Sequence, residues 1–182
     1  MSLSPHLLMM WLQQFSAEGL TLALFVSCGI LILSMMRFFG AVGLMVYSSL
    51  AVIAANIQVQ KATTFEFFHE PIALGTVVFA SIFYVSSILT EYYGKAEAKK
   101  AVWLSFSGMI LITVFMFFTM GFKPGLGYQE THKAMCVLFL PAPALLISSL
   151  AAYVIGQLND IWIFSVLSKL TSGKALWLRT FV

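Results

Sequence analysis

Charged residues are absent from five long stretches of the chain, 19–36, 38–60, 71–90, 101–122 and 134–159. Each stretch is close to or longer than the ~18 residues that a helix needs to cross the hydrocarbon core of a bilayer. The pattern therefore predicts an all-α fold, a polytopic transmembrane helix bundle with about five spanning helices. We place these helices at about 19–36, 40–58, 71–93, 100–121 and 143–166.

Short segments divide the apolar stretches. The first two helices are joined only by RFFG at 37–40. The two prolines in LPAPA, at 140–144, interrupt helical hydrogen bonding. We therefore expect a short lead-in segment before Pro141 and a span that starts near Pro143.

Three segments outside the predicted spans have patterns of their own. Residues 3–15, LSPHLLMMWLQQF, are typical of a short interfacial helix. Polar and β-branched residues at 58–71 predict a short hairpin. Gly and Pro at 121–133 predict turns.

Composition supports a membrane location. The 182-residue chain is 60% hydrophobic and 9% charged, whereas roughly one quarter of a soluble domain is charged. Water could not cover so much apolar surface, so we expect a lipid bilayer around a single integral membrane domain, 1–182. The net charge of +3 is too small to indicate a nucleic-acid partner, because clustered basic residues carry that binding.

Lys and Arg positions predict the orientation. If GKAEAKK, at 94–100, is cytoplasmic, seven of the ten Lys and Arg fall inside, as the positive-inside rule requires. The seven are Arg37, Lys95, Lys99, Lys100, Lys169, Lys174 and Arg179. The other three are Lys61, Lys123 and Lys133. The N-terminus is then outside and the C-terminus cytoplasmic.

Two predicted helices carry polar side chains at steps of three and four residues, which places them on one helical face. The stripes are Ser81, Tyr84, Ser87 and Glu91 on the third helix, and Ser149, Tyr153, Gln157 and Asp160 on the fifth. Asn56, near the outer end of the second helix, is a third candidate. Polar groups in lipid are costly and should face a partner or a cavity. We hypothesise that the two stripes face each other across a polar cavity.

Both carboxylates have a second interpretation. Glu91 ends its span and can meet water or pair with Lys95, four residues on. Asp160 is followed by eight uncharged residues before Lys169, so it lies deeper. A structural carboxylate and a ligand-binding one are both open there. Gln157 can also join two helices, as buried amides do.

No motif in the spans indicates catalysis. They contain no Ser–His pair, no HExxH and no Asp-rich metal motif. A membrane-embedded enzyme is therefore the weakest alternative, and we expect no cofactor and no metal.

Two segments resemble a known family. GTVVFASIFYVSSILTEYYGKAEAKKAV, at 75–102, is similar to a segment of queuosine-precursor transporters in which a helix ends in Asp-x-x-x-Glu-x-Tyr-Gly before basic residues. SSLAAYVIGQLNDIWIFSVLSKLTSGKALWLR, at 148–179, resembles their second signature, with Gly-Gln-x-x-Asp, a Lys-rich loop and Trp-Leu-Arg. Asn56 matches a third, weaker position. The resemblance covers roughly 40–180.

The resemblance implies an integral carrier of the bacterial inner membrane, also called a vitamin uptake transporter. Such carriers import deazaguanine bases used to make queuosine in tRNA, such as 7-cyano-7-deazaguanine or queuine. A carboxylate can accept from the donor edge of the base, an amide can pair with its oxygen and a ring N–H, and aromatic rings can stack on its face. The implied substrate-binding residues are Asn56, Tyr84, Ser87, Glu91, Tyr153, Gln157 and Asp160.

Two departures keep alternatives open. Ser87 stands where the family pattern has its first Asp, and the chain stops at WLRTFV where the family continues with two more helices. We therefore expect a domain that lacks those helices. A non-transporting remnant, an accessory or structural subunit, and dependence on a separate ATPase module are the alternatives. The sequence leaves open the base carried, the energy source and whether protomers form a homo-oligomer.

Overall fold

The structure is a computed structural model that describes residues 5–66, 70–139 and 143–171. Within these ranges it contains six α-helices, one π-helix and two short strands, which confirms the predicted all-α class. The elements are α1 (Pro5–Leu12), α2 (Ala17–Gln58), β1 (Ala62–Thr63), β2 (Ile72–Ala73), α3 (Thr76–Ile88), the π-helix η1 (Leu89–Tyr93), α4 (Lys95–Gly121), α5 (Gln129–Phe139) and α6 (Pro143–Leu170).

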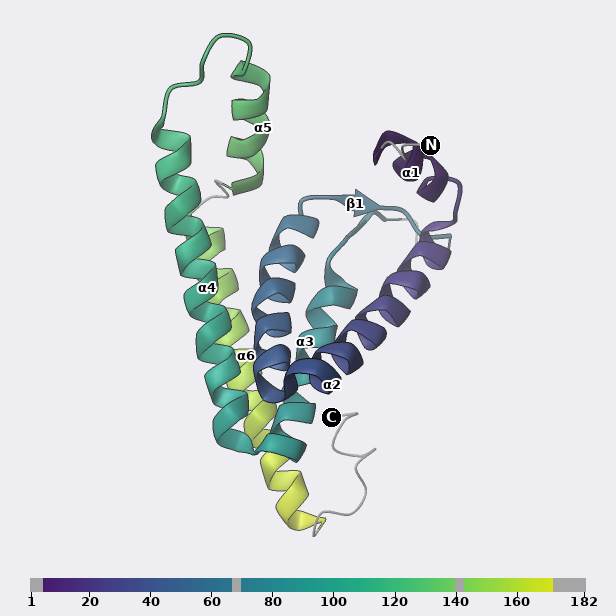
Figure 1. Cartoon of the computed structure of the whole chain (residues 1–182), viewed down its shortest axis with the longest axis vertical. Coiled ribbons are helices and arrows are strands. Elements are labelled where there is room, and N and C mark those ends of the chain that lie inside the picture. The colour runs from purple at the N-terminus through teal and green to yellow at the C-terminus, as the bar shows by residue number, and fades with distance from the viewer. Residues whose placement is uncertain (1–4, 67–69, 140–142, 172–182) are drawn as a thin grey trace.

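Helix α2 contains the first two predicted spans. At Gly40 the backbone leaves the helical region (φ 58°, ψ −138°), a conformation that glycine adopts readily. The chain reverses there, so α2 has a first arm (17–39) and a second arm (41–58) (Figure 1). Its 42 residues would extend about 63 Å at ~1.5 Å per residue, about twice the ~30 Å of a hydrocarbon core. RFFG therefore does separate two spans.

The other spans lie near their predicted positions. Counting α2 once, four helices of the described residues are long and apolar enough to cross a membrane, the others being Thr76–Tyr93, Lys95–Gly121 and Ser148–Leu170. The predicted start of the third span at 71 is wrong, because β2 occupies Ile72–Ala73. The start of the fourth at 100 is also late, because α4 begins at Lys95.

The predicted connections are largely confirmed. Ala62 pairs with Ala73 and Thr63 with Ile72 in an antiparallel hairpin, slightly beyond the predicted 58–71. A turn closes where the Tyr128 N–H donates to the Gly125 carbonyl oxygen at 3.1 Å. Helix α5 is the expected lead-in segment, and it begins inside the range assigned to turns.

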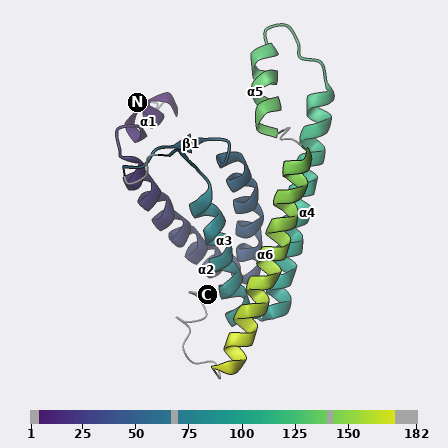
Figure 2. The ribbon, with the colours of Figure 1, turned by 180° about the vertical axis from the view of Figure 1, so that it is seen from behind.

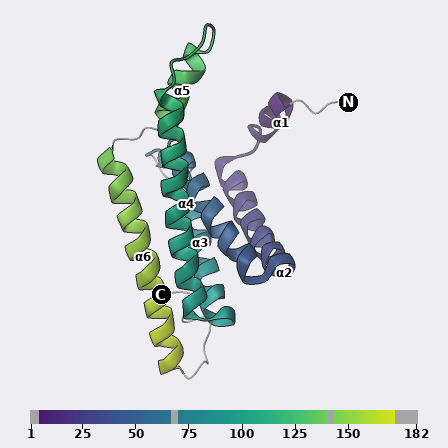
Figure 3. The same cartoon turned by 60° about the vertical axis from the view of Figure 1, so that its left-hand side comes forward.

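Four segments surround the core: the second arm of α2, α3, α4 and α6. Helices α3 and α4 both contact α2, and α6 contacts both α3 and α4. Figure 2 shows α6 lying along α4. In Figure 3, α6, α4 and α2 follow one another from left to right. The first arm, described in full, buries only Cys28 and Ile32. Among the described residues, two contacts join it to the rest. Tyr47 lies next to Cys28 and is hydrogen-bonded to Ser81 of α3 at 2.8 Å. The Glu66 N–H donates to Glu18 Oε1 at 2.6 Å.

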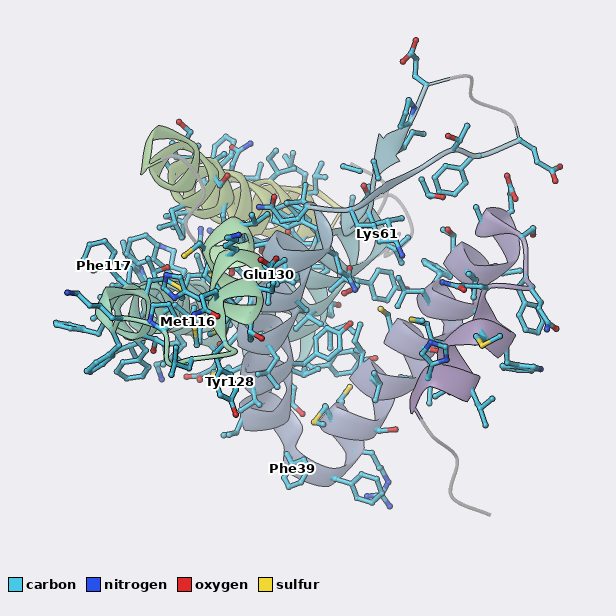
Figure 4. The ribbon with its side chains drawn as sticks, turned by 90° about the horizontal axis from the view of Figure 1, so that it is seen from above. Phe39, Lys61, Met116, Phe117, Tyr128 and Glu130 are labelled. Carbon is cyan, nitrogen blue, oxygen red and sulfur yellow. The ribbon has the colours of Figure 1, made fainter. Side chains whose placement is uncertain are left out.

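The outer surface of the bundle is apolar. In the most apolar 18-residue segment of each spanning helix, only 11% to 28% of the segment is buried inside the bundle. Figure 4 shows Phe39 at the bend of α2 and Phe117 on α4 directed away from the bundle, and they are 63% and 67% exposed. Exposed apolar area of this extent requires lipid rather than water. The chain is therefore a multi-pass membrane protein.

The bundle has two different ends. The hairpin end carries β1, β2 and α5, and the bend end carries the reversal of α2, η1 and the last turns of α6 (Figure 1).

Candidate functional site

Each of the four core segments contributes one buried polar side chain. Within the described residues these are Ser48 on α2, Ser86 on α3, Ser105 on α4 and Gln157 on α6. Polar groups at the meeting point of membrane helices must find partners there, because lipid offers none. We call Ser86, Gln157 and the neighbouring Asp160 the inner polar cluster.

The α6 side of this cluster is deeply buried. Gln157 is 1% exposed and Tyr153, one turn earlier, is 4% exposed. Asp160 is half-buried, and the Ser86 hydroxyl lies near its carboxylate. Ser86 Oγ, Gln157 Nε2 and Asp160 Oδ2 are buried without a hydrogen-bond partner among the described residues. Each such group costs roughly 1–3 kcal/mol, so three together in one place require an explanation.

A small void lies next to Ser86 and Gln157 of the inner polar cluster. Its volume is about 10 Å³, and Ser48, Ser86, Tyr153 and Gln157 are among the residues on its wall. A void of this size accommodates roughly one water molecule. In this arrangement it therefore excludes a bicyclic base.

A much larger cavity opens on the hairpin end. It measures about 430 Å³ and lies between the second arm of α2, α3 and α6. Its wall includes Asn56, Phe79, Phe83 and Tyr153. The rings meet edge to face, with centroids 5.6 Å apart for Phe79–Phe83 and 6.2 Å apart for Phe79–Tyr153. We call this the α3-side cavity.

A second cavity adjoins it. This α4-side cavity of about 320 Å³ includes Met109, Thr113 and Leu138 and shares Asn56 and Ser149 with the first. Asn56 donates its Nδ2 to the Val52 carbonyl oxygen at 2.8 Å. Nδ2 also donates to Met109 Sδ at 4.0 Å, so the amide oxygen is the group left to meet a ligand.

Tyr153 lies between the α3-side cavity and the small void. It is on the wall of both the α3-side cavity and the small void. A molecule that entered from the hairpin end would therefore have to pass Tyr153 to reach Gln157 and Asp160.

The predicted stripe on α6 does face the interior. Tyr153 and Gln157 are buried and Asp160 is half-buried, whereas Ser149, at the start of the row, is exposed and lies on the walls of both cavities. Gly156, beside this stripe, packs against the ring of Phe83 on α3. The structure thus brings α6 against α3, as the sequence indicated.

The predicted stripe on α3 does not form one interior face. Tyr84 is 57% exposed, Ser81 bonds to Tyr47, Ser87 is half-buried and Glu91 is exposed. The expectation that two polar stripes face each other is therefore wrong for this helix.

The buried face of α3 lies beside that stripe, at Val78, Ile82, Val85, Ser86 and Leu89. Sequence reasoning missed Ser86, although the adjacent pair Ser86–Ser87 was visible. Because nearly every position around α3 is apolar, its pattern does not indicate which of the two faces the core. The π-helix η1 also changes the helical register before Glu91.

Metal binding has no support in the part of the chain that the structure describes. No three His, Cys, Asp or Glu side chains lie close enough there to hold an ion.

Comparisons with known proteins agree with the sequence resemblance. Residues 73–182 match a family described as "Putative vitamin uptake transporter". The chain is 35% identical over 151 residues to a Bacillus subtilis (strain 168) protein named "Probable queuosine precursor transporter". That match covers 82% of this chain and 65% of the relative. No solved structure matches the chain.

Proposed function

This chain belongs to the vitamin uptake transporter family, and we propose that it carries a queuosine precursor, a deazaguanine base, across the bacterial inner membrane. The named relative supports this substrate class. The apolar spans support a location in the membrane. In the proposed orientation the C-terminus is cytoplasmic and the hairpin end faces outward.

The α3-side cavity is the observation that carries the proposal. Its volume of about 430 Å³ lies within the roughly 300–1,000 Å³ typical of small-molecule sites. Asn56 supplies an amide on its wall, and Phe79, Phe83 and Tyr153 supply rings. A flat base that stacks on such rings gains roughly 1–3 kcal/mol, and an amide oxygen can accept from a ring N–H.

The proposed binding residues are Asn56, Tyr153, Gln157 and Asp160. Asn56 and Tyr153 would receive the base first, and Gln157 and Asp160 lie beyond Tyr153. Among the sequence candidates, Tyr84, Ser87 and Glu91 lie outside this group, and their roles stay predictions.

Uptake of a labelled 7-deazaguanine into proteoliposomes tests the proposal. Asn56→Ala should raise the substrate concentration for half-maximal uptake about tenfold, because one hydrogen bond worth roughly 1.4 kcal/mol is lost. Asp160→Asn should reduce uptake at least as much, since the amide replaces an acceptor-only carboxylate.

The matched control is Ser107→Ala, on the exposed side of α4, which should transport normally. Glu91→Gln, measured in parallel, tests whether Glu91 contributes despite its exposure. Undiminished uptake in both the Asp160→Asn and Glu91→Gln variants would reject the proposal.

A further inference from the structure

Three buried polar atoms without a hydrogen-bond partner in the described chain meet where α3 packs on α6. They are Ser86 Oγ, Gln157 Nε2 and Asp160 Oδ2. Ser86 lies between the other two, because it shares the small void with Gln157 and lies near the Asp160 carboxylate. Ser86 is 5% exposed and Gln157 1% exposed, so neither lipid nor bulk water reaches them.

The chemical types of these atoms are complementary to one small molecule. An amide nitrogen only donates, a carboxylate oxygen only accepts, and a hydroxyl does both. A water molecule in the void can accept from Gln157 and donate to Ser86, and the Ser86 hydroxyl can in turn donate to the Asp160 carboxylate beside it. Buried waters typically make about three hydrogen bonds of this kind, and the void of about 10 Å³ has room for roughly one. A cation fits less well, because the Gln157 amide hydrogens would repel it.

We propose that Ser86, Gln157 and Asp160 form one polar site that binds a single water in the present arrangement and receives the hydrogen-bonding edge of the transported base when α3 and α6 separate. The second half rests on the proposed function, and the first half does not. The structure thus assigns Ser86 to the site, where the family-like motif had pointed to Ser87.

The base has hydrogen-bonding groups complementary to the side chains of this site. Its ring N–H and exocyclic amine are donors for Asp160, and its ring carbonyl oxygen accepts from Gln157. The base would displace the water and take over its hydrogen bond from Gln157, which limits the loss of affinity.

The contacts between α3 and α6 are of a kind that can open. A Cβ placed on Gly156 would lie 3.9 Å from Cζ of Phe83, which is ordinary van der Waals contact. The rings of Tyr153 and Phe79 also pack against each other. Because these contacts are ring packing, rotation of side chains at this point would connect the α3-side cavity to the site. Tyr153 is on both walls and is the side chain that must move.

A double-mutant cycle in thermal stability tests the water site without any substrate. Ser86→Ala and Gln157→Met each remove one partner of the water from the purified full chain. If one water joins the two side chains, the combined loss in Tm should be smaller than the sum of the single losses.

The matched control combines Ser87→Ala with Gln157→Met, for which the losses should add. Additive losses for the Ser86 pair would overturn the water site. If Gln157→Met does not yield folded protein, Gln157→Leu takes its place in the same comparison with Ser86→Ala.

Binding of two bases tests the proposal that this site receives the hydrogen-bonding edge of the base. 7-Deazahypoxanthine is 7-deazaguanine without the exocyclic amine. Asp160→Asn should weaken the affinity for 7-deazaguanine at least tenfold and the affinity for 7-deazahypoxanthine clearly less, because both bases keep the ring N–H that faces Asp160 and only 7-deazaguanine also has the amine. Equal weakening of both bases would overturn the assignment of Asp160 to the amine.

The two failures can be told apart. If the wild-type chain binds and transports neither base while the stability cycle stays non-additive, the proposed function and the base-binding half fall, and the water site stands. If both bases bind and the cycle is additive, the water site falls and the proposed function stands.

Discussion

The hydrogen bond between Tyr47 and Ser81 is a contact whose role should be structural. Ser81 Oγ donates to the Val78 carbonyl oxygen at 2.6 Å, so the Tyr47 hydroxyl donates to Ser81 at 2.8 Å. Ser81→Ala removes this acceptor at the contact between α2 and α3. The expected loss is about 0.5–1.5 kcal/mol, seen as a Tm lower by a few degrees.

Uptake by the Ser81→Ala variant should stay within twofold of wild type, because Ser81 is on the wall of neither cavity. Ser107→Ala, an exposed serine on α4, should change neither Tm nor uptake. Abolished uptake in a folded Ser81→Ala protein would instead place Ser81 in the transport path.

Sequence periodicity located α6 residues better than α3 residues, and the reason is physical. In α6, Gln157 and Asp160 are large polar groups whose desolvation cost forces that face inward. In α3 the candidates were mostly hydroxyls, which can bond back to their own helix, as Thr90 does to the Ser86 carbonyl oxygen. Hydroxyl positions therefore say little about which face meets the core, and Ser86 emerged only from packing.

The bend of α2 depends on Gly43 as well as on Gly40. A Cβ on Gly43 would collide with the Met35 carbonyl oxygen and lie 2.8 Å from Phe39 Cβ. Gly43→Ala should therefore force the two arms apart, at a cost of roughly 1–3 kcal/mol for overpacking. We expect a clearly lower Tm in detergent.

The matched control for Gly43→Ala is Gly29→Ala, in the middle of the first arm. Nothing lies within 4 Å of a Cβ at Gly29, and alanine favours a helix over glycine by roughly 0.5–1 kcal/mol. Its Tm should be unchanged or higher. Equal losses for both variants would show that the bend tolerates a side chain at Gly43.

The existence of the helices followed from the absence of charge, but their boundaries did not. The residues at 71–75 contain no charge and were included in the third span, although β2 pairs there with β1. Hydrogen bonding between segments ten residues apart is not visible in hydropathy. Conversely, α4 starts at Lys95, because basic residues at a helix end can reach the membrane surface while the backbone stays helical.

The arrangement of the two ends permits a direct test of orientation. The bend end carries Arg37, Lys95, Lys99, Lys100 and Lys169, whereas Lys61, Lys123 and Lys133 lie at the hairpin end. The positive-inside rule then predicts that the hairpin end faces out.

Single cysteines report the orientation in intact cells. The two natural cysteines, Cys28 and Cys136, are first replaced by serine. Tyr128→Cys, at the exposed hairpin end, should react with a membrane-impermeant maleimide, and Ala96→Cys should react only after permeabilisation. The reverse pattern would invert the proposed topology and place the α3-side cavity on the cytoplasmic side.

Removal of positive charge from the bend end should weaken the preference for this orientation. Lys95→Gln, Lys99→Gln and Lys100→Gln together leave four of the seven predicted inner cations against three outer ones. Because Lys and Arg near span ends set topology, a fraction of the molecules should insert upside down. Both reporter cysteines would then be partly labelled in intact cells.

The control replaces Lys61 and Lys133 by glutamine, which sharpens the bias to seven against one, and it should leave the labelling pattern unchanged. If the triple variant keeps a single orientation, charge near 94–100 does not set the topology. In that case the outward direction of the α3-side cavity would have to rest on the labelling of Tyr128→Cys alone. An inverted fraction would also lower net uptake in proportion to its size, because only molecules with the cavity on the substrate side can load it.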